Sequence, residues 1–398
     1  MLRVEMLCTG DEVLHGQIID TNAAWLADYL FQAGLPMTSR MTVGDDLDAL
    51  VTAITQRSRI ADVLIVNGGL GPTSDDLSAL AAATAAGEGL VEHAEWLARM
   101  EVFFTERGRV MAPSNRKQAQ IPASAEMVDN PVGTACGFAL RLNKCLMFFT
   151  PGVPSEFKVM VDQQIMPRLR DRFAISAPPL CLRLTTFGRS ESDLASQLDG
   201  LALPPDVVLG YRSAMPIIEL KLTGPASQRA AMESLWEQVR AVAGENALFE
   251  GTEGLPAQLA RRLRDRNLLL AISEDFTAGL LNWRLQSASV PLAGGELRVN
   301  DDVLNLPLFA EETGQLAERH GAPLALRIGG RRDDQLMIAL HTPQGSFAQM
   351  IQYNVPRYSL NTHQDVVAML AMNMLRRWLN DWPVYGGHGW INVVETLA

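Results

Sequence analysis

Glycine-rich turns that directly follow predicted strands are the feature that most constrains the fold of this chain. Residues 3–8 and 62–66 predict buried strands, and they run into Gly10 and into Gly68-Gly69. Apolar residues at helical spacing predict helices from about residue 22 to Gly34 and over 47–54. This alternation predicts a right-handed parallel α/β sheet, whose ligands bind beyond the carboxyl ends of the strands.

The rest of the 398-residue chain predicts further structural units. Strands at 138–142 and 145–149 are separated by only two residues and predict a tight hairpin, and a helix follows at about 155–166. Three strands and two helices then predict a small α+β module, and its first helix is capped by Ser190. The strands are expected at 181–187, 207–212 and 217–222, and the second helix at 226–242. A second strand–helix alternation follows from about residue 250.

Composition narrows the possible function classes. The net charge of −11 argues against broad, non-specific nucleic-acid binding, so no nucleic-acid partner is expected. Four scattered cysteines predict neither a disulfide framework nor a zinc site, and they fit a reducing compartment. The sequence has no run of 18 apolar residues and no signal peptide, so we expect a cytoplasmic protein without membrane contact.

Four polar islands interrupt the apolar pattern of the first 170 residues, and the sharpest is the segment 68–76, Gly-Gly-Leu-Gly-Pro-Thr-Ser-Asp-Asp. Three glycines in four positions let the backbone approach a ligand, and a following helix would point free N–H groups at a phosphate. Asp75 and Asp76 would repel a bare phosphate, so we expect a divalent cation between them and the ligand. Arg116 and Lys117 would neutralise the remaining charge.

Each island also has a purely structural interpretation. A Gly-Gly-x-Gly turn is more often a simple strand–helix connection, and Asp75 and Asp76 could be helix N-caps. Glu156, which is expected in the first turn of a helix, could simply compensate the helix dipole. Four islands in one α/β unit, three of them just after predicted strands, favour a functional site instead.

Together the islands resemble the ordered signatures of the CinA (competence/damage-inducible) family over residues 1–170. The matching segments are GDEVLHG and DTN in 10–22, GGLGPTSDD at 68–76, NRKQA at 115–119, NPVGT at 130–134 and PGVPSE at 151–156. The domain is also similar to the molybdopterin-binding domains of molybdenum-cofactor biosynthesis proteins. The resemblance implies a homodimer and a metal-dependent pyrophosphatase acting on ADP-ribose or a related nucleotide diphosphate. A non-catalytic protein that binds a pterin or a nucleotide is the alternative.

The resemblance also assigns roles to individual residues. Asp75 and Asp76 would hold the divalent cation (Mg²⁺, Mn²⁺ or Co²⁺) or act as acid–base residues. Asp45 would be a further catalytic carboxylate, although Asp46 could equally fill that role. Lys117 would offset charge on the departing phosphate. The expected substrate-binding residues are Gly10, Asp11, Glu12, Asn22, Gly68, Gly69, Gly71, Thr73, Asn115, Asn130, Gly133, Gly152 and Glu156.

The predicted domains are 1–172, of the molybdopterin-binding type, a small α+β domain at 173–248, and an α/β domain at 249–398. The middle domain resembles the KH-type insert of CinA proteins. It lacks the GXXG loop with which KH modules bind single-stranded nucleic acid, so we expect a structural insert or a dimer contact. Arg189 and Arg212 could still reach a ligand phosphate.

The last domain resembles a nicotinamide-mononucleotide amidohydrolase that has lost its chemistry. Where that family has Glu-Ser-Cys-Thr-Gly-Gly, this chain has residues 274–279, with Asp275 in place of the serine nucleophile, Phe276 in place of the cysteine and Ala278 in place of a glycine. Asp275 cannot replace the hydroxyl nucleophile without a base.

Two further elements of that family are altered. Val299 and Leu304 stand where the family has a tyrosine and an activating lysine, and neither side chain transfers protons. The Gly-x-x-Gly-Pro loop is reduced to residues 329–332. We therefore expect the fold without amidase activity, while deamidation through other residues is a third possibility.

Overall fold

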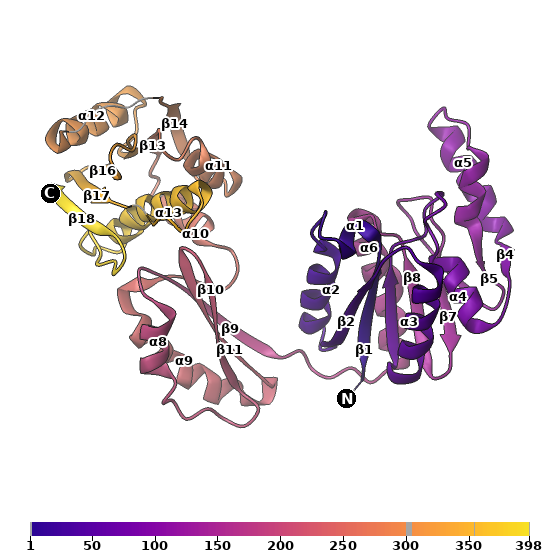
Figure 1. Cartoon of the computed structure of the whole chain (residues 1–398). Helices are drawn as coiled ribbons and strands as arrows, with labels where there is room; N and C mark the ends of the chain where they lie inside the picture. The colour runs from indigo at the N-terminus through magenta and orange to yellow at the C-terminus, as the bar shows by residue number, and fades with distance from the viewer. Residues whose placement is uncertain (1, 300–304, 354, 398) are drawn as a thin grey trace. The chain divides into compact units, whose positions relative to one another are not determined.

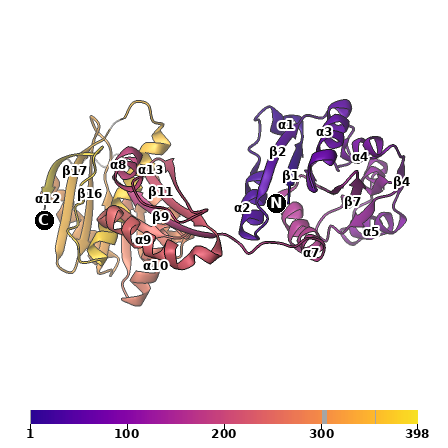
Figure 2. The same cartoon turned by 90° about the horizontal axis from the view of Figure 1, so that it is seen from below.

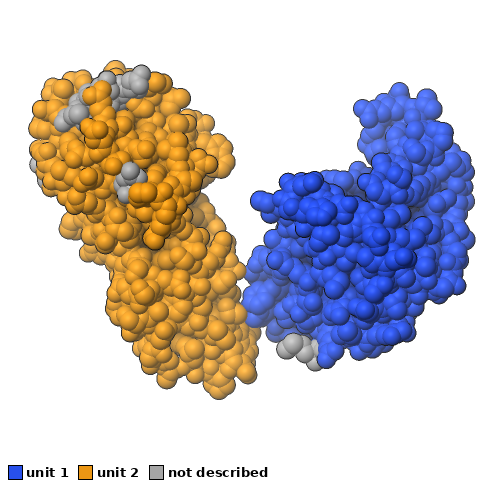
Figure 3. Space-filling view, in the orientation of Figure 1, with its two compact units in different colours: residues 1–179 blue, residues 180–398 orange. Residues whose placement is uncertain are grey.

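The computed structural model describes residues 2–299, 305–353 and 355–397. The chain divides into two compact units, residues 1–179 (unit 1) and 180–398 (unit 2), which are coloured separately in Figure 3. Leu304, one of the positions compared above, lies outside the described residues.

Unit 1 is built on a six-stranded sheet in the order β2-β1-β3-β8-β7-β6 (Figure 1). The first four of these strands are parallel, and the last two run antiparallel to their neighbours. The strands are β1 (Val4–Thr9), β2 (Met37–Val43), β3 (Val63–Asn67), β6 (Glu126–Val128), β7 (Gly137–Leu142) and β8 (Cys145–Thr150). A separate pair is formed by β4 (Leu90–Glu92) and β5 (Gln120–Pro122).

Helices cover both faces of this sheet, because successive side chains of each strand point to opposite sides. Leu64 and Val66 of β3 pack with α3, α4 and α5, whereas Val63 and Ile65 pack with α2, α6 and α7. The helices are α1 (Asp11–Leu14), α2 (Thr21–Gln32), α3 (Leu47–Ile60), α4 (Ser78–Ala86), α5 (Ala94–Glu106), the 3-10 helix η1 (Pro113–Ala119), α6 (Pro154–Met160) and α7 (Met166–Arg172). A π turn (Val161–Ile165) joins α6 to α7.

The predicted parallel α/β sheet and the tight hairpin at residues 143 and 144 are confirmed. Strand β2 was not predicted. It lies at the edge of the sheet and pairs only with β1, and its side chains from Thr38 to Arg40 are exposed. An edge strand of this kind does not need the apolar pattern from which strands are predicted.

Unit 2 begins with a four-stranded antiparallel sheet in the order β10-β11-β9-β12. Its elements are β9 (Leu180–Phe187), α8 (Glu191–Leu198), β10 (Val208–Ala214), β11 (Ile217–Gly224), the 3-10 turns at Ala226–Gln228 and Gly244–Asn246, α9 (Arg229–Ala243) and β12 (Ala247–Glu250). The Ser190 hydroxyl accepts a hydrogen bond from the Asp193 N–H, so the predicted helix cap is confirmed. The likeness to KH modules stays a prediction.

A second six-stranded sheet follows in the order β14-β13-β15-β16-β17-β18. Helices α10, α11 and α13 pack on one face and α12 on the other, and Figure 2 shows α13 beside the strands. The helices are α10 (Leu255–Asp265), α11 (Leu280–Ser287), α12 (Leu306–Arg319) and α13 (Leu360–Leu379). The strands are β13 (Leu270–Glu274), β14 (Leu292–Leu297), β15 (Leu324–Ile328), β16 (Gln335–Thr342), β17 (Gly345–Gln352) and β18 (Asn392–Leu397).

The two units meet in sequence at residues 179 and 180, a few residues after the predicted boundary at 172 and 173. The further division of unit 2 at residue 248 stays a prediction. Over the described parts of the chain, no helix has both the length and the apolar character needed to cross a bilayer.

Limited proteolysis is expected to separate the two units. Residues 174–179 form neither helix nor strand, and 176–178 are exposed, so this segment can enter a protease active site. Brief digestion with proteinase K should give two fragments whose new ends lie between residues 174 and 180, read by intact mass spectrometry. Earlier cleavage inside a sheet of either unit would contradict this division.

Candidate functional site

The loops that follow β1, β3 and β8 meet at one edge of the unit 1 sheet, as expected for parallel strands. In Figure 1 the short helix α1 and the helix α6 mark this end of the sheet. The loops enclose a cleft of about 530 Å³. Eleven of the predicted site residues line it: Gly10, Glu12, Asn22, Asp45, Gly68, Gly69, Gly71, Asp75, Asp76, Gly152 and Glu156.

The glycine turn after β3 forms one wall of this cleft. Gly68 and Gly69 have φ angles of 108° and 68°, in the left-handed region that favours glycine. A Cβ atom on Gly68 would lie 2.7 Å from Thr9 Oγ1. The turn can therefore pack against β1 only if position 68 has no side chain. Among the described residues, none accepts a hydrogen bond from the backbone N–H of Gly69, Leu70 or Gly71. These three N–H groups are available to an anion in the cleft.

Asp75 and Asp76 lie at the far end of the same turn. Asp76 Oδ2 accepts hydrogen bonds from the backbone N–H (2.9 Å) and the hydroxyl (2.5 Å) of Thr73. Hydrogen bonding within this turn and the charge of Lys117 lower the pKa of Asp75, which therefore stays ionised. Helix α4 begins later, with Leu77 at its N-cap position and no side-chain cap, so the N-cap interpretation of the two aspartates is wrong.

Asp45 enters the cleft from the loop after β2. Its Oδ2 accepts a hydrogen bond from the Asp11 N–H (3.1 Å), and its own N–H donates to Asp11 Oδ1 (3.2 Å). Partial burial and the nearby charges of Asp11, Glu12 and Asp75 raise the pKa of Asp45. The neighbouring Asp46 does not line the cleft and instead caps α3 by accepting from Ala49 N–H (2.8 Å). Of the two alternatives, only Asp45 lies in the site.

The charged side chains that line the cleft are all acidic. Six carboxylates line it: Glu12, Asp20, Asp45, Asp75, Asp76 and Glu156. Among the described residues that line it, none is Lys or Arg. A phosphate could enter such a surface only with a cation that offsets the repulsion.

Glu156 is held in place by the loop after β6. Asn130 is buried, and its Nδ2 donates to Glu156 Oε2 (2.7 Å) and to the Ala135 carbonyl (3.1 Å), while its Oδ1 accepts from Gly133 N–H (3.1 Å). A Cβ atom on Gly133 would overlap the Glu156 carboxylate. Asn130 and Gly133 therefore position Glu156 from behind the cleft wall. Glu156 also lies in the first turn of α6, where the helix dipole favours it.

Other predicted residues lie beside the cleft. The Lys117 ammonium donates to the Thr73 carbonyl and lines a smaller cavity of about 260 Å³ that shares Gly69, Gly71 and Asp76 with the cleft. Arg116 forms an ion pair with Glu92 (2.8 Å). Asn115 Nδ2 donates to Gln118 Oε1 (2.9 Å), and Gln118 lines the cleft.

Sequence reasoning missed Thr9 and Asn67, which line the cleft at the ends of β1 and β3. Both are buried, and each is a polar residue at the carboxyl end of an apolar strand, a signal that could have identified them. Asn67 binds Asn22 side chain to side chain (3.0 Å). Within the described part of the chain, Thr9 Oγ1 and Asn22 Oδ1 have no hydrogen-bond partner, which costs about 1–3 kcal/mol for each buried group.

The cleft carboxylates are suitable ligands for a divalent cation, but they do not form a complete coordination shell by themselves. Carboxylate oxygens are the donors that Mg²⁺ and Mn²⁺ prefer, and Asp75 and Asp76 line the same wall. Over the described residues, no group of three His, Cys, Asp or Glu side chains is close enough to hold a metal ion. A cation here would therefore complete its shell with ligand phosphate oxygens and water, as Mg²⁺ commonly does.

In unit 2, the segment 274–279 joins β13 to α11. The buried Glu274 carboxylate accepts hydrogen bonds from the Thr277 hydroxyl (2.5 Å) and from the N–H groups of Leu281 (3.0 Å) and Asn282 (2.8 Å), so it caps α11. The Arg331 guanidinium lies 4.9 Å from the centre of the Phe276 ring. Ala278 has a φ of 51°, a strained conformation for a residue other than glycine. The Val299 side chain is exposed.

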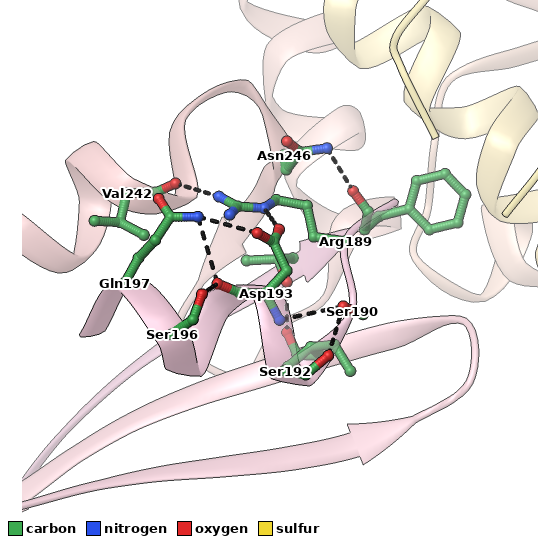
Figure 4. A network of polar contacts seen from close by, with 11 residues as sticks. Arg189, Ser190, Ser192, Asp193, Ser196, Gln197, Val242 and Asn246 are labelled. Carbon is green, nitrogen blue, oxygen red and sulfur yellow. Dashed lines mark hydrogen bonds and ion pairs between the residues drawn. The ribbon is translucent and has the colours of Figure 1, made fainter. Parts of the chain in front are cut away.

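The arginines predicted to reach a phosphate from the four-stranded sheet are held within unit 2. Figure 4 shows Arg189 between Asp193 Oδ2 (2.5 Å) and the Val242 carbonyl (2.6 Å), and Gln197 also contacts Asp193. Arg212 pairs with Glu219 (3.5 Å). The Arg189 network therefore fixes α8 against α9.

Comparison with known proteins identifies relatives of this chain. A family described as "Probable molybdopterin binding domain" matches residues 5–171. A protein of Escherichia coli (strain SMS-3-5 / SECEC) named "CinA-like protein" is 62% identical over 401 residues, covering 100% of this chain and 99% of the relative. A protein of E. coli (strain K12) with the same identity and coverage is named "NMN amidohydrolase-like protein YfaY". The solved structure of CinA from Thermoplasma acidophilum is 30% identical with a TM-score of 0.38, covering 42% of this chain and 96% of that one.

Replacing Asp45 with Asn is expected to stabilise the protein at neutral pH. Because its pKa is raised in the folded state, ionised Asp45 opposes folding once the pH exceeds that pKa. The melting temperature should rise by about 1–2 °C at pH 7, since solvent screens this partly exposed group, and the gain should shrink as the pH approaches 4.

Asp46→Ala is the matched control, because it removes the α3 cap and should lower stability by about 1 kcal/mol at both pH values. A destabilised Asp45→Asn variant at pH 7 would show that the carboxylate cluster is not repulsive.

Proposed function

The chain belongs to the CinA-like protein family, and on that premise we propose that unit 1 is a metal-dependent pyrophosphatase for ADP-ribose or a related nucleotide diphosphate. The observation that carries the proposal is the pairing of three available backbone N–H groups with six carboxylates around one cleft. The N–H groups suit an anion, and the carboxylates suit a cation. A diphosphate that carries a divalent cation satisfies both.

The N–H groups of Gly69, Leu70 and Gly71 would bind the diphosphate oxygens, and Asp75 and Asp76 would hold the cation. When bound, the cation would polarise the phosphate oxygens and lower the pKa of a coordinated water. The glycine turn is fixed by Ser78, whose hydroxyl donates to the Gly68 carbonyl (2.7 Å). The N–H groups are therefore oriented before the ligand arrives.

Asp45 is the residue best suited to accept the proton of the attacking water. Its raised pKa makes it a stronger base than an ordinary aspartate, and it lines the cleft together with Asp75 and Asp76. The water oxygen forms a new bond to one phosphorus while the bridging P–O bond breaks. The products of ADP-ribose hydrolysis are AMP and ribose 5-phosphate. The Lys117 ammonium, which donates to the Thr73 carbonyl, offsets negative charge on the departing phosphate.

Changing Asp75 and Asp76 together to Asn should abolish hydrolysis, because both cation-binding carboxylates are lost. Release of AMP from ADP-ribose with Mg²⁺, Mn²⁺ or Co²⁺, followed by chromatography, is expected to fall at least about 100-fold, which is about 2.7 kcal/mol of transition-state stabilisation. The circular dichroism spectrum should not change.

The matched control is Asp48→Asn with Asp171→Asn, which makes the same change in net charge at exposed positions outside the cleft. Normal turnover by the Asp75→Asn/Asp76→Asn protein would reject this site. A wild-type protein that binds ADP-ribose without releasing AMP would instead be a binding protein.

For unit 2 we propose a fold of the amidohydrolase type without amidase activity. Asp275 stands where a serine nucleophile is expected, and Phe276 packs under Arg331. Val299 is an exposed apolar residue that cannot transfer a proton. These contacts favour a structural or regulatory role for this part of the chain.

The protein should release no ammonia from nicotinamide mononucleotide, as followed by a coupled glutamate dehydrogenase assay. The same preparation must hydrolyse ADP-ribose, which shows that it is folded and active. Asp275→Ser should not restore the activity, since the tyrosine and lysine positions stay altered. Ammonia release by the wild type that Asp275→Ala removes would overturn the proposal.

A further inference from the structure

One wall of the cleft carries two buried polar atoms that are unpaired among the described residues. Thr9 and Asn22 are each only 6% exposed, and both line the cleft. None of the residues that the structure describes forms a hydrogen bond with Thr9 Oγ1 or Asn22 Oδ1. Buried polar atoms are nearly always paired, so their partners are expected to come from the ligand.

The orientation of the Asn22 amide is fixed by a relay of side chains. Asn67 Nδ2 donates to the Pro151 carbonyl (2.7 Å) and to Thr150 Oγ1 (3.3 Å), which leaves Asn67 Oδ1 as an acceptor. Asn22 Nδ2 donates to that oxygen (3.0 Å) and to the Gly152 carbonyl (2.8 Å). Turning either amide over would bring oxygen against a backbone carbonyl, since carbonyls only accept.

Both hydrogens of Asn22 Nδ2 are therefore used, and the unpaired atom is an oxygen that can only accept. An ionised phosphate has no hydrogen to donate to it. We propose that a neutral group of the ligand, an O–H of a sugar or an N–H of a base, donates to Asn22 Oδ1, that the Thr9 hydroxyl, which can both donate and accept, binds the same group, and that this wall selects nucleotide diphosphates over inorganic diphosphate.

The proposal rests on the proposed function, because it takes the cleft as the nucleotide-diphosphate site. It assigns a different task to each wall. The N–H groups of Gly69, Leu70 and Gly71 are offered to phosphate oxygens, whereas Asn22 offers an acceptor to the organic part of the ligand. A ligand without a donor group leaves the two buried atoms unpaired and is bound less tightly.

Thr9→Val is the cleanest test, because it replaces only the unpaired hydroxyl by a methyl group of the same shape. Asn22 is less suitable, since its replacement would also break the contacts to Asn67 and Gly152. Thr9→Val should keep or raise the melting temperature. A purely structural role for Thr9 would leave ligand affinity unchanged.

Affinity is measured by calorimetry with Mg²⁺ for ADP-ribose with a methylene bridge, which resists hydrolysis, and for inorganic pyrophosphate. Thr9→Val should weaken binding of the ADP-ribose analogue by about tenfold or more and binding of inorganic pyrophosphate by less than about twofold. The affinity of both proteins for ribose 5-phosphate identifies the donor group. If Thr9→Val weakens ribose 5-phosphate binding as much as it weakens binding of the ADP-ribose analogue, the donor is a sugar O–H. If the affinity for ribose 5-phosphate does not change, the donor is a base N–H. The control Thr186→Val removes a buried hydroxyl bonded to the Ile218 carbonyl (3.1 Å) in unit 2, and should lower stability without changing affinity.

Equal effects of Thr9→Val on the two diphosphates, or no effect on either, would overturn the inference and leave the proposed function standing. Wild-type protein that binds neither diphosphate would refute the proposed function itself.

Discussion

Electrostatic repulsion among the carboxylates of one cleft is the constraint on which the unit 1 site depends. Six acidic side chains line a space of about 530 Å³. Two like charges 4 Å apart near a protein surface repel by about 4 kcal/mol, so such a cluster is costly unless a cation joins it. Burial, together with the neighbouring charges of Asp11, Glu12 and Asp75, raises the pKa of Asp45. Under the proposed function, the same charges would exclude free phosphate and admit it with a divalent cation, which would make cation and ligand binding interdependent.

The fold creates this cluster through small residues in its loops. The carboxyl ends of parallel strands bring loops from distant parts of the sequence to one edge of the sheet. Two glycines then make room for two of these carboxylates, and a third makes room for Asp11 beside the cleft, since a Cβ atom on each would overlap a carboxylate oxygen. The pairs are Gly44 with Asp11, Gly71 with Asp76, and Gly133 with Glu156. The glycines that suggest a phosphate site in the sequence thus also position its acidic residues.

The sequence predicted the central strands and the glycine turn because apolar runs that end in glycine have few other interpretations. It did not predict β2, whose polar edge carries no periodic signal. Motif order placed Asp45 and Asp75 in the site, whereas the position of Lys117 behind Thr73 depends on tertiary packing that no local pattern encodes. Thr9 was missed because its importance lies in an unmade hydrogen bond, which only the folded structure reveals.

The central claim is that the cleft binds a diphosphate only together with a cation. Calorimetric titration with ADP-ribose that has a methylene bridge, performed with Mg²⁺ and again with EDTA, tests it most directly. The account predicts measurable binding with Mg²⁺ and a loss of at least about 100-fold in EDTA, because six carboxylates then face the bare phosphates. Equal affinity under the two conditions would contradict it.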